Sequence, residues 1–241
     1  MNQQTLAAAF TAAAAEINTL SRAFAETPTE QAAASIDNSQ KIYQVQAQMQ
    51  VAKIDPAADK AITEAYGNAK AAIEAKDGDV YRVQRQLILK GFLHATYTGA
   101  KHALDAGNVQ EAEPWVQYVQ DMARWDANHE AVIAMKDLQA GNKTVRGTVQ
   151  GAIYGWYASQ VKSEIEASIG NMKKGHMGSA HVEAIEAAEY LKPIEPEMGT
   201  KLGATKMKEL NQQLAQYHDA TAKKDLPRAE GIAKTIVGIL E

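Results

Sequence analysis

The side chains best suited to chemistry lie in one short segment, Met172 to His181. The segment contains two histidines, His176 and His181, and two methionines, Met172 and Met177. Imidazole and thioether groups are ligands for copper and for haem iron. Two glycines in the same segment would let a loop wrap around a ligand. We therefore predict a metal or haem site here, and the alternative is an ordinary polar connection between helices.

An acidic stretch follows this segment and offers oxygen ligands. Glu183, Glu186 and Glu189 recur at every third position, so they lie along one side of a helix. Carboxylates suit hard cations such as iron(III) or calcium. We therefore add Glu186 to the predicted ligands His176, His181, Met172 and Met177. The alternative is a solvated helix face, because charge runs usually point to water.

The signatures of common enzyme sites are missing from the sequence. It contains no glycine-rich phosphate loop, no His-Glu-x-x-His motif and no Ser–His–Asp cue. Di-iron bundles need Glu-x-x-His, and the nearest pattern is Asp126-Ala127-Asn128-His129. The absence of cysteine excludes thiolate metal sites, cysteine nucleophiles and iron–sulfur clusters. We therefore expect a protein that is not an enzyme.

The charge pattern excludes two further classes of partner. The formal net charge is −4, and the basic residues are interspersed with acidic ones. A nucleic-acid surface needs a clustered basic face, so we expect no nucleic-acid partner. A bilayer span needs about 18–20 consecutive apolar residues, and no stretch reaches this length. We therefore expect no membrane span.

The elements that would position these ligands are helices throughout. Alanine dominates the apolar residues, aromatic residues make up only 6%, and short Gly, Asn, Asp or Pro signals punctuate the chain. The helices are expected at roughly 5–26, 29–53, 57–76, 80–106, 109–125, 127–140, 143–169, 179–191, 202–223 and 227–240. The sequence therefore predicts an all-α protein of about ten helices, arranged as a bundle or a short solenoid.

Similar turns recur along the chain and indicate a duplication of helical hairpins. Gly78-Asp79 aligns with Gly141-Asn142, and Gly107-Asn108 aligns with Gly170-Asn171, each pair 63 positions apart. Repeated hairpins bury their apolar faces against neighbouring copies. We therefore predict an N-terminal bundle at 1–126, with the first repeat at 57–126. A C-terminal bundle is expected at 127–241, with the second repeat at 127–197 and a terminal hairpin after it.

One stretch near the second repeat's end resembles a known family. Ala188-Glu189-Tyr190-Leu191 and Ile194-Glu195-Pro196-Glu197 are similar to a stretch in the helical extracytoplasmic domains of bacterial FTR1-type iron permeases. The resemblance covers residues 150–241 and implies an envelope protein connected with iron uptake. The Arg-Glu-x-x-Glu signature of the permease membrane domain is absent, and so is the His-x-x-Glu signature of periplasmic imelysin-type iron proteins.

Two functions are consistent with these patterns. The first is a soluble protein that binds iron, copper or haem and takes part in iron handling in the cell envelope. It would lie in the periplasm or elsewhere outside the cytoplasm, although a cytoplasmic location stays open. The second is a non-enzymatic helical-repeat scaffold that binds a protein partner or oligomerises.

Overall fold

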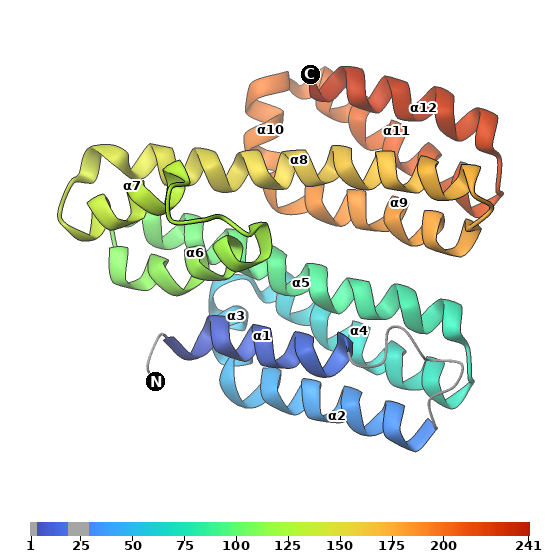
Figure 1. Cartoon of the computed structure of the whole chain (residues 1–241), viewed down its shortest axis with the longest axis horizontal. Coiled ribbons are helices and arrows are strands. Elements are labelled where there is room, and N and C mark those ends of the chain that lie inside the picture. The colour runs from blue at the N-terminus through green and yellow to red at the C-terminus, as the bar shows by residue number, and fades with distance from the viewer. Residues whose placement is uncertain (1–3, 19–28) are drawn as a thin grey trace. The chain divides into compact units, whose positions relative to one another are not determined.

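The computed structural model describes residues 4–18 and 29–241, and within these ranges it contains helices and no strand (Figure 1). This confirms the prediction of an all-α fold. The helices of the N-terminal part are α1 (Gln4–Asn18), α2 (Thr29–Gln46), α3 (Gln48–Ile54), α4 (Pro56–Glu74), α5 (Gly78–Asp105), α6 (Val109–Ala123) and α7 (Glu130–Gln139). A 3-10 turn, η1 (Lys143–Val145), leads into α8 (Arg146–Lys173). The last elements are α9 (Met177–Leu191), the 3-10 turn η2 (Lys192–Ile194), α10 (Glu195–Leu202), α11 (Ala204–Ala222) and α12 (Leu226–Leu240).

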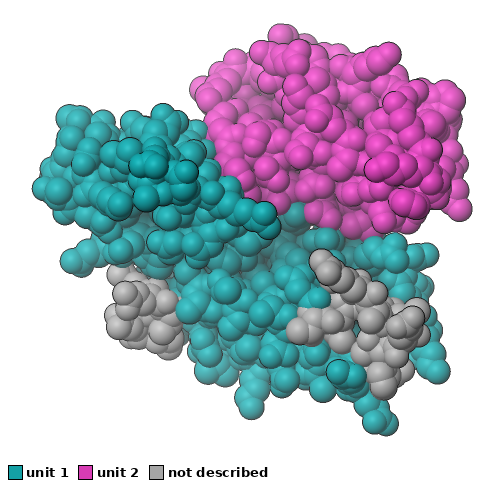
Figure 2. Space-filling model, viewed as in Figure 1, with its two compact units in different colours: residues 1–153 teal, residues 154–241 magenta. Residues whose placement is uncertain are grey.

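The chain divides into two compact units, which Figure 2 colours separately. Unit 1 covers Met1–Ile153 and unit 2 covers Tyr154–Glu241, so the division falls inside α8. The boundary expected between residues 126 and 127 separates two sequence repeats. That boundary and the duplication of helical hairpins stay predictions.

An aromatic cluster forms the core of unit 1. Phe10 of α1 stacks on Phe92 of α5, with ring centroids 4.7 Å apart, and meets Tyr118 of α6 edge-on at 5.4 Å. Tyr43 of α2 packs on the same Phe92 ring at 5.6 Å. Such ring pairs add stability beyond the area they bury. Rings from four helices of unit 1 therefore form one cluster around Phe10 and Phe92.

Short polar residues start the helices, as the punctuation of the sequence predicts. The side chains of Asp77 and Asn108 accept hydrogen bonds from backbone amides in the first turns of α5 and α6. Asp55 caps α4 in the same way and also contacts His94 Nε2 at 3.2 Å and Thr98 Oγ1 at 3.1 Å on α5. An N-cap satisfies an amide that the helix itself leaves unpaired. Asp55 thus fixes both the start of α4 and its packing on α5.

Buried hydroxyl groups tie α8 to its neighbours in unit 2. Ser168 Oγ donates a hydrogen bond to the carbonyl of Ala180 on α9, at 2.7 Å. The Tyr217 hydroxyl of α11 donates to the carbonyl of Ile165, at 3.3 Å. Burial raises the pKa of Tyr217 to about 12, so this hydroxyl keeps its proton at neutral pH. These contacts fix α9 and α11 against the second half of α8.

Three expectations about the helices were wrong. No helix was expected between residues 191 and 202, but Glu195–Leu202 forms α10. The expected helix at 29–53 is interrupted at Ala47, where α2 ends and α3 begins. The segment expected to be a ligand-wrapping loop is mostly helical, because α8 extends to Lys173 and α9 begins at Met177. Only residues 174–176 form the turn. The break predicted at Thr27-Pro28 lies outside the described residues.

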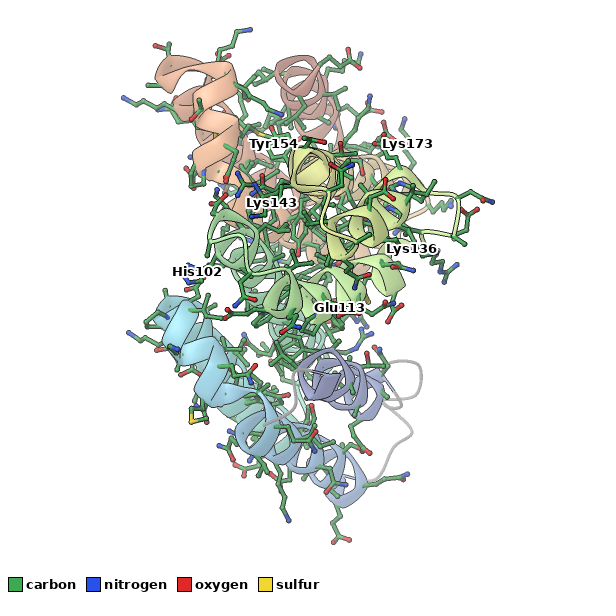
Figure 3. All side chains as sticks on the ribbon, turned by 90° about the vertical axis from the view of Figure 1, so that its left-hand side faces the viewer. His102, Glu113, Lys136, Lys143, Tyr154 and Lys173 are labelled. Atoms are coloured by element: carbon green, nitrogen blue, oxygen red, sulfur yellow. The ribbon has the colours of Figure 1, made fainter. Side chains whose placement is uncertain are left out.

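Charged side chains cover the outer faces of the helices. Figure 3 labels exposed examples on different helices, namely His102, Glu113, Lys136, Lys143 and Lys173. These positions are solvated helix faces, which is where charged side chains are most stable. The apolar side chains are left to fill the interiors of the two units.

Candidate functional site

The five ligands predicted from the sequence lie in unequal surroundings within α8 and α9. Met172 is buried in unit 2, with 2% of its surface exposed, and Glu186 is buried as well. His176 is exposed and occupies the N-cap position of α9, and Met177 is the first residue of that helix. His181 lies one turn further along and is half-buried. Their placement as a joint ligand set stays a prediction.

His181 has a second imidazole as its neighbour. The ring of His218, on α11, lies with its centroid 4.6 Å from that of His181, and the two planes are tilted by 36°. His218 is not among the ligands predicted from the sequence, because nothing in the local pattern around it marks it. The two histidines face each other only because α9 and α11 pack side by side.

A hydroxyl group fixes the orientation of the His181 ring. Thr221 Oγ1 donates a hydrogen bond to the carbonyl of His218, at 2.9 Å. Its oxygen therefore keeps its lone pairs for His181, whose Nδ1 lies 3.4 Å away. In this arrangement Nδ1 of His181 carries the proton and donates it to Thr221. Nε2 of His181 then has the free lone pair.

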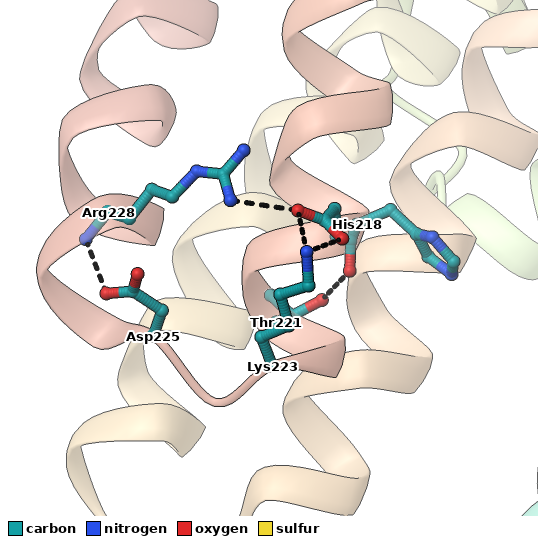
Figure 4. A network of polar contacts seen from close by, with 6 residues as sticks. His218, Thr221, Lys223, Asp225 and Arg228 are labelled. Carbon is teal, nitrogen blue, oxygen red and sulfur yellow. Dashed lines mark hydrogen bonds and ion pairs between the residues drawn. The ribbon is translucent and has the colours of Figure 1, made fainter.

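The other side of α11 is held by an ion-pair network. Asp219 pairs with Lys223 at 2.8 Å and with Arg228 of α12 at 2.8 Å. Asp225 caps α12 by accepting a hydrogen bond from the amide of Arg228. Figure 4 shows this network, with the His218 ring pointing away from it. The turn between α11 and α12 is thus fixed, and the ring of His218 takes no part in fixing it.

The environment of His181 favours its neutral form. Partial burial lowers the pKa of His181, and the neighbouring His218 lowers it further. A neutral imidazole has a lone pair for a proton or a metal ion, whereas an imidazolium has none. His181 is therefore a competent ligand at neutral pH.

A groove adjoins the pair and follows the interface of α9 and α11. It has a volume of about 480 Å³, and His218 lines one part of it. Apolar residues are part of its lining, among them Ala184, Ala188 and Leu214. The lining also includes Glu189, Lys192, Glu195 and Asn211. The groove therefore offers both apolar surface and a set of charged groups next to the histidine pair.

The charged lining of the groove is held by hydrogen bonds. Asn211 of α11 donates from Nδ2 to Glu195 Oε1, at 2.6 Å. Lys192 pairs with Glu189, one turn earlier in the chain. Glu195 belongs to the Ile194–Glu197 stretch on which the family resemblance rests, and it lies at the start of α10. That stretch thus contributes directly to the wall of the groove.

Glu183 lies at the packed junction of α8 and α9, although the sequence places it on the acidic stripe. Asn171 of α8 donates from Nδ2 to both of its carboxylate oxygens, at 2.7 and 2.9 Å. Burial raises the pKa of the Glu183 carboxyl, and the nearby Glu186 raises it further. These two glutamates are therefore part of the helix packing, so the acidic stripe is not one solvated face.

In the described part of the chain, no group of three or more His, Asp or Glu side chains is close enough to hold a metal ion. The histidine pair is therefore a two-ligand arrangement, with further positions around any bound ion left to water or to another ligand.

A family model described as the iron permease FTR1 N-terminal domain matches residues 3–236. The chain belongs to this family. The resemblance seen in residues 150–241 is confirmed, and the match extends over residues 3–236. Comparisons with curated proteins and with solved structures give no match.

Membership of the family links this FTR1 N-terminal domain to iron-permease-related iron handling. Its fold is the all-α arrangement that the resemblance implies. Among the helices described here, none is both long enough and apolar enough to cross a bilayer.

Proposed function

We propose that this FTR1 N-terminal domain lies outside the cytoplasm, binds iron ions reversibly and delivers them to an iron permease. The family match over residues 3–236 is the observation that carries the proposal. Iron is here the cargo of the domain, so no catalytic step is needed and none is proposed.

Reversible binding is the physical requirement for such a role. A carrier must release its ion to the next site, so a closed shell of four protein ligands, typical of structural metal sites, would hold the ion too firmly. Exposed or half-exposed side chains with open coordination positions suit a delivery role better. His181 and His218 on unit 2 have this character, since one is half-buried and the other exposed.

Iron uptake measured in cells tests the proposal. Deletion of the coding region for residues 3–236, with any permease part left in frame, is expected to lower uptake of radioactive iron under iron limitation. Re-expression of the full protein restores it, and uptake of radioactive zinc serves as the matched control. Iron uptake that is equal in deleted and intact cells would contradict the proposal.

The location is tested separately. A protease added to cells with a permeabilised outer layer should cleave the domain while a cytoplasmic marker protein stays intact. Protection of the domain to the same extent as the marker would contradict the extracytoplasmic part of the proposal.

The haem and scaffold alternatives rest on sequence patterns alone and stay predictions.

A further inference from the structure

We propose that His181 and His218 together form a binding site for one divalent first-row transition-metal ion. Each imidazole supplies one nitrogen, and water completes the shell. The choice of iron(II) as the natural ion rests on the proposed function, whereas the site itself rests on the two histidines and their surroundings.

The rings of His181 and His218 lie next to each other. They come from neighbouring helices, α9 and α11, and their centroids are 4.6 Å apart. This spacing brings two imidazoles within reach of a common ion after rotation of the His218 side chain, while Thr221 keeps the ring of His181 in place. His218 is exposed, so its rotation needs no change of the packed core.

The ring of His181 has an oxygen neighbour of the kind that supports a metal ligand. A metal-bound histidine usually donates its other ring N–H to a neighbouring oxygen, which fixes both the tautomer and the ring orientation. Thr221 Oγ1 provides this oxygen, at 3.4 Å from Nδ1 of His181. Its own proton is committed to the carbonyl of His218, so it can only accept from the ring. Nε2 of His181 is therefore the atom offered to the ion.

The ligand chemistry of imidazole sets the class of ion. A neutral imidazole offers one nitrogen lone pair, so two neighbouring rings can form two coordinate bonds to one ion. Imidazole is a good ligand for iron(II), zinc, nickel and copper(II), and copper(II) binds most tightly of the divalent series. Copper(II) is therefore a sensitive probe for the site.

The groove gives an ion access to the pair. It is lined by His218 and leads along α9 and α11 to Glu189 and Glu195. Lys192 pairs with Glu189, so Glu195 leaves the charged lining net negative, which favours entry of a hydrated cation. With only two protein ligands, the ion keeps several waters and can leave again. The site is therefore built for exchange rather than for structural stability.

The competing explanation is that the two rings only pack against each other. Titration of the metal-free full-length protein with copper(II), zinc(II) and, without oxygen, iron(II) distinguishes the two cases. The variants are His181→Gln, His218→Gln and the double variant, each checked for unchanged helicity by circular dichroism. His176→Gln is the matched control, because His176 is an exposed histidine at the start of the same helix.

The proposal expects one equivalent of copper(II) bound by the wild type, with nitrogen ligands visible in its electron paramagnetic resonance spectrum. Each single variant should bind at least about tenfold more weakly, and the double variant should lose the site. His176→Gln should bind as the wild type does. Equal affinity in the wild type and the double variant would overturn the proposal. The proposal would also be overturned if His176→Gln lost copper(II) binding and His218→Gln kept it.

A measurement on the unmodified protein supplements the variants. Substoichiometric copper(II) should broaden the ring proton resonances of His181 and His218 before those of the remaining histidines. Broadening that begins elsewhere would overturn the site.

The outcomes also separate the two proposals. If the double variant loses metal binding while deletion of the domain leaves iron uptake unchanged, the site stands and the function fails. If deletion lowers uptake while the double variant binds metal normally, the function stands and the site fails.

Discussion

The indole ring of Trp115 occupies the space that a side chain at Gly99 would need. A Cβ atom built on Gly99 would lie 2.5 Å from Cδ2 of Trp115, well inside the closest approach of two carbon atoms. Gly99 lies on α5 and Trp115 on α6, and both are buried. The absence of a side chain at Gly99 therefore sets how closely α5 and α6 can approach each other.

Gly99→Ala is expected to destabilise the protein by about 2 kcal/mol, because the new methyl group overpacks a rigid ring in the core. Gly67→Ala is the matched control, since no atom lies within 4 Å of its Cβ position on α4. The control should stabilise α4 by about 0.5–1 kcal/mol. Urea unfolding followed by circular dichroism measures both. A stability of Gly99→Ala equal to or above that of the control would contradict the close contact.

Phe10→Ala is expected to lower the free energy of unfolding by about 3–5 kcal/mol. The ring is fully buried and stacks on Phe92, so its removal leaves a cavity where several helices of unit 1 meet. Thr11→Ala, at the next and exposed position of α1, should change stability by less than about 0.5 kcal/mol. Thermal unfolding compares the two variants. Similar effects of both would show that α1 is not anchored through Phe10.

Ser39 connects three helices through two hydrogen bonds. Its Oγ donates to the carbonyl of Ala13 at 2.8 Å, so the Tyr66 hydroxyl, 2.7 Å away, donates to Ser39. Ser39→Ala should cost about 1–3 kcal/mol, because it leaves buried polar groups on α1 and α4 without their partner. Urea unfolding of Ser39→Ala, Tyr66→Phe and the double variant measures the coupling. The double variant should cost less than the two single variants added together, and strict additivity would contradict the link.

Much of the fold could be predicted from the sequence, because helix starts are encoded locally. Asn108 and Asp225 each precede a helix and cap it, as their types and positions indicate. The helix expected from residue 80 begins two residues earlier, at Gly78, because Asp77 is its cap. The interruption at Ala47 could not be predicted. Alanine is a strong helix former, and neither glycine nor proline marks the break between α2 and α3.

Only one of the two histidines of the candidate site could be predicted from the sequence, because the contact between them is not encoded locally. His181 stood out because it belongs to a dense segment of possible ligands. Its partner His218 lies on another helix, and the local sequence around His218 carries no sign of the contact. The pairing depends on the register in which α9 packs along α11, which is a tertiary property. Met172 was predicted as a ligand because of its neighbours in the sequence, but it lies on a helix whose periodicity places its thioether in the core.

The carboxylate of Asp105 predicts a weak dependence of stability on pH. Lys101 donates a hydrogen bond to Asp105 at 2.8 Å and Gln150 donates another at 2.7 Å, and these contacts lower the pKa of Asp105 below 3.8. A carboxyl whose pKa is lowered by folding adds stability above its unfolded pKa and loses it as the pH falls through the folded value. Asp105→Asn should therefore be less stable than the wild type at pH 7. The difference should fade below about pH 3.8.

The size of this effect is limited by exposure. About half of the Asp105 side chain is open to solvent, so the loss at pH 7 should stay near 0.5 kcal/mol. Thermal unfolding at a series of pH values measures it, with Glu113→Gln, an exposed carboxylate on α6, as the control. A difference between Asp105→Asn and the wild type that persists unchanged at pH 2 would rule out the ionised carboxylate as its source.

Thr221 provides a test of the metal site that leaves both histidines in place. Thr221→Ala removes the oxygen that faces Nδ1 of His181, so the ring loses its fixed tautomer and orientation. Loss of such an outer contact weakens metal binding about 10–100-fold in known sites, and we expect the low end because the contact is 3.4 Å long. Thr221→Ser keeps the hydroxyl and should retain the wild-type affinity for copper(II). Equal affinities of the alanine and serine variants would remove Thr221 from the site, whatever the histidine variants show.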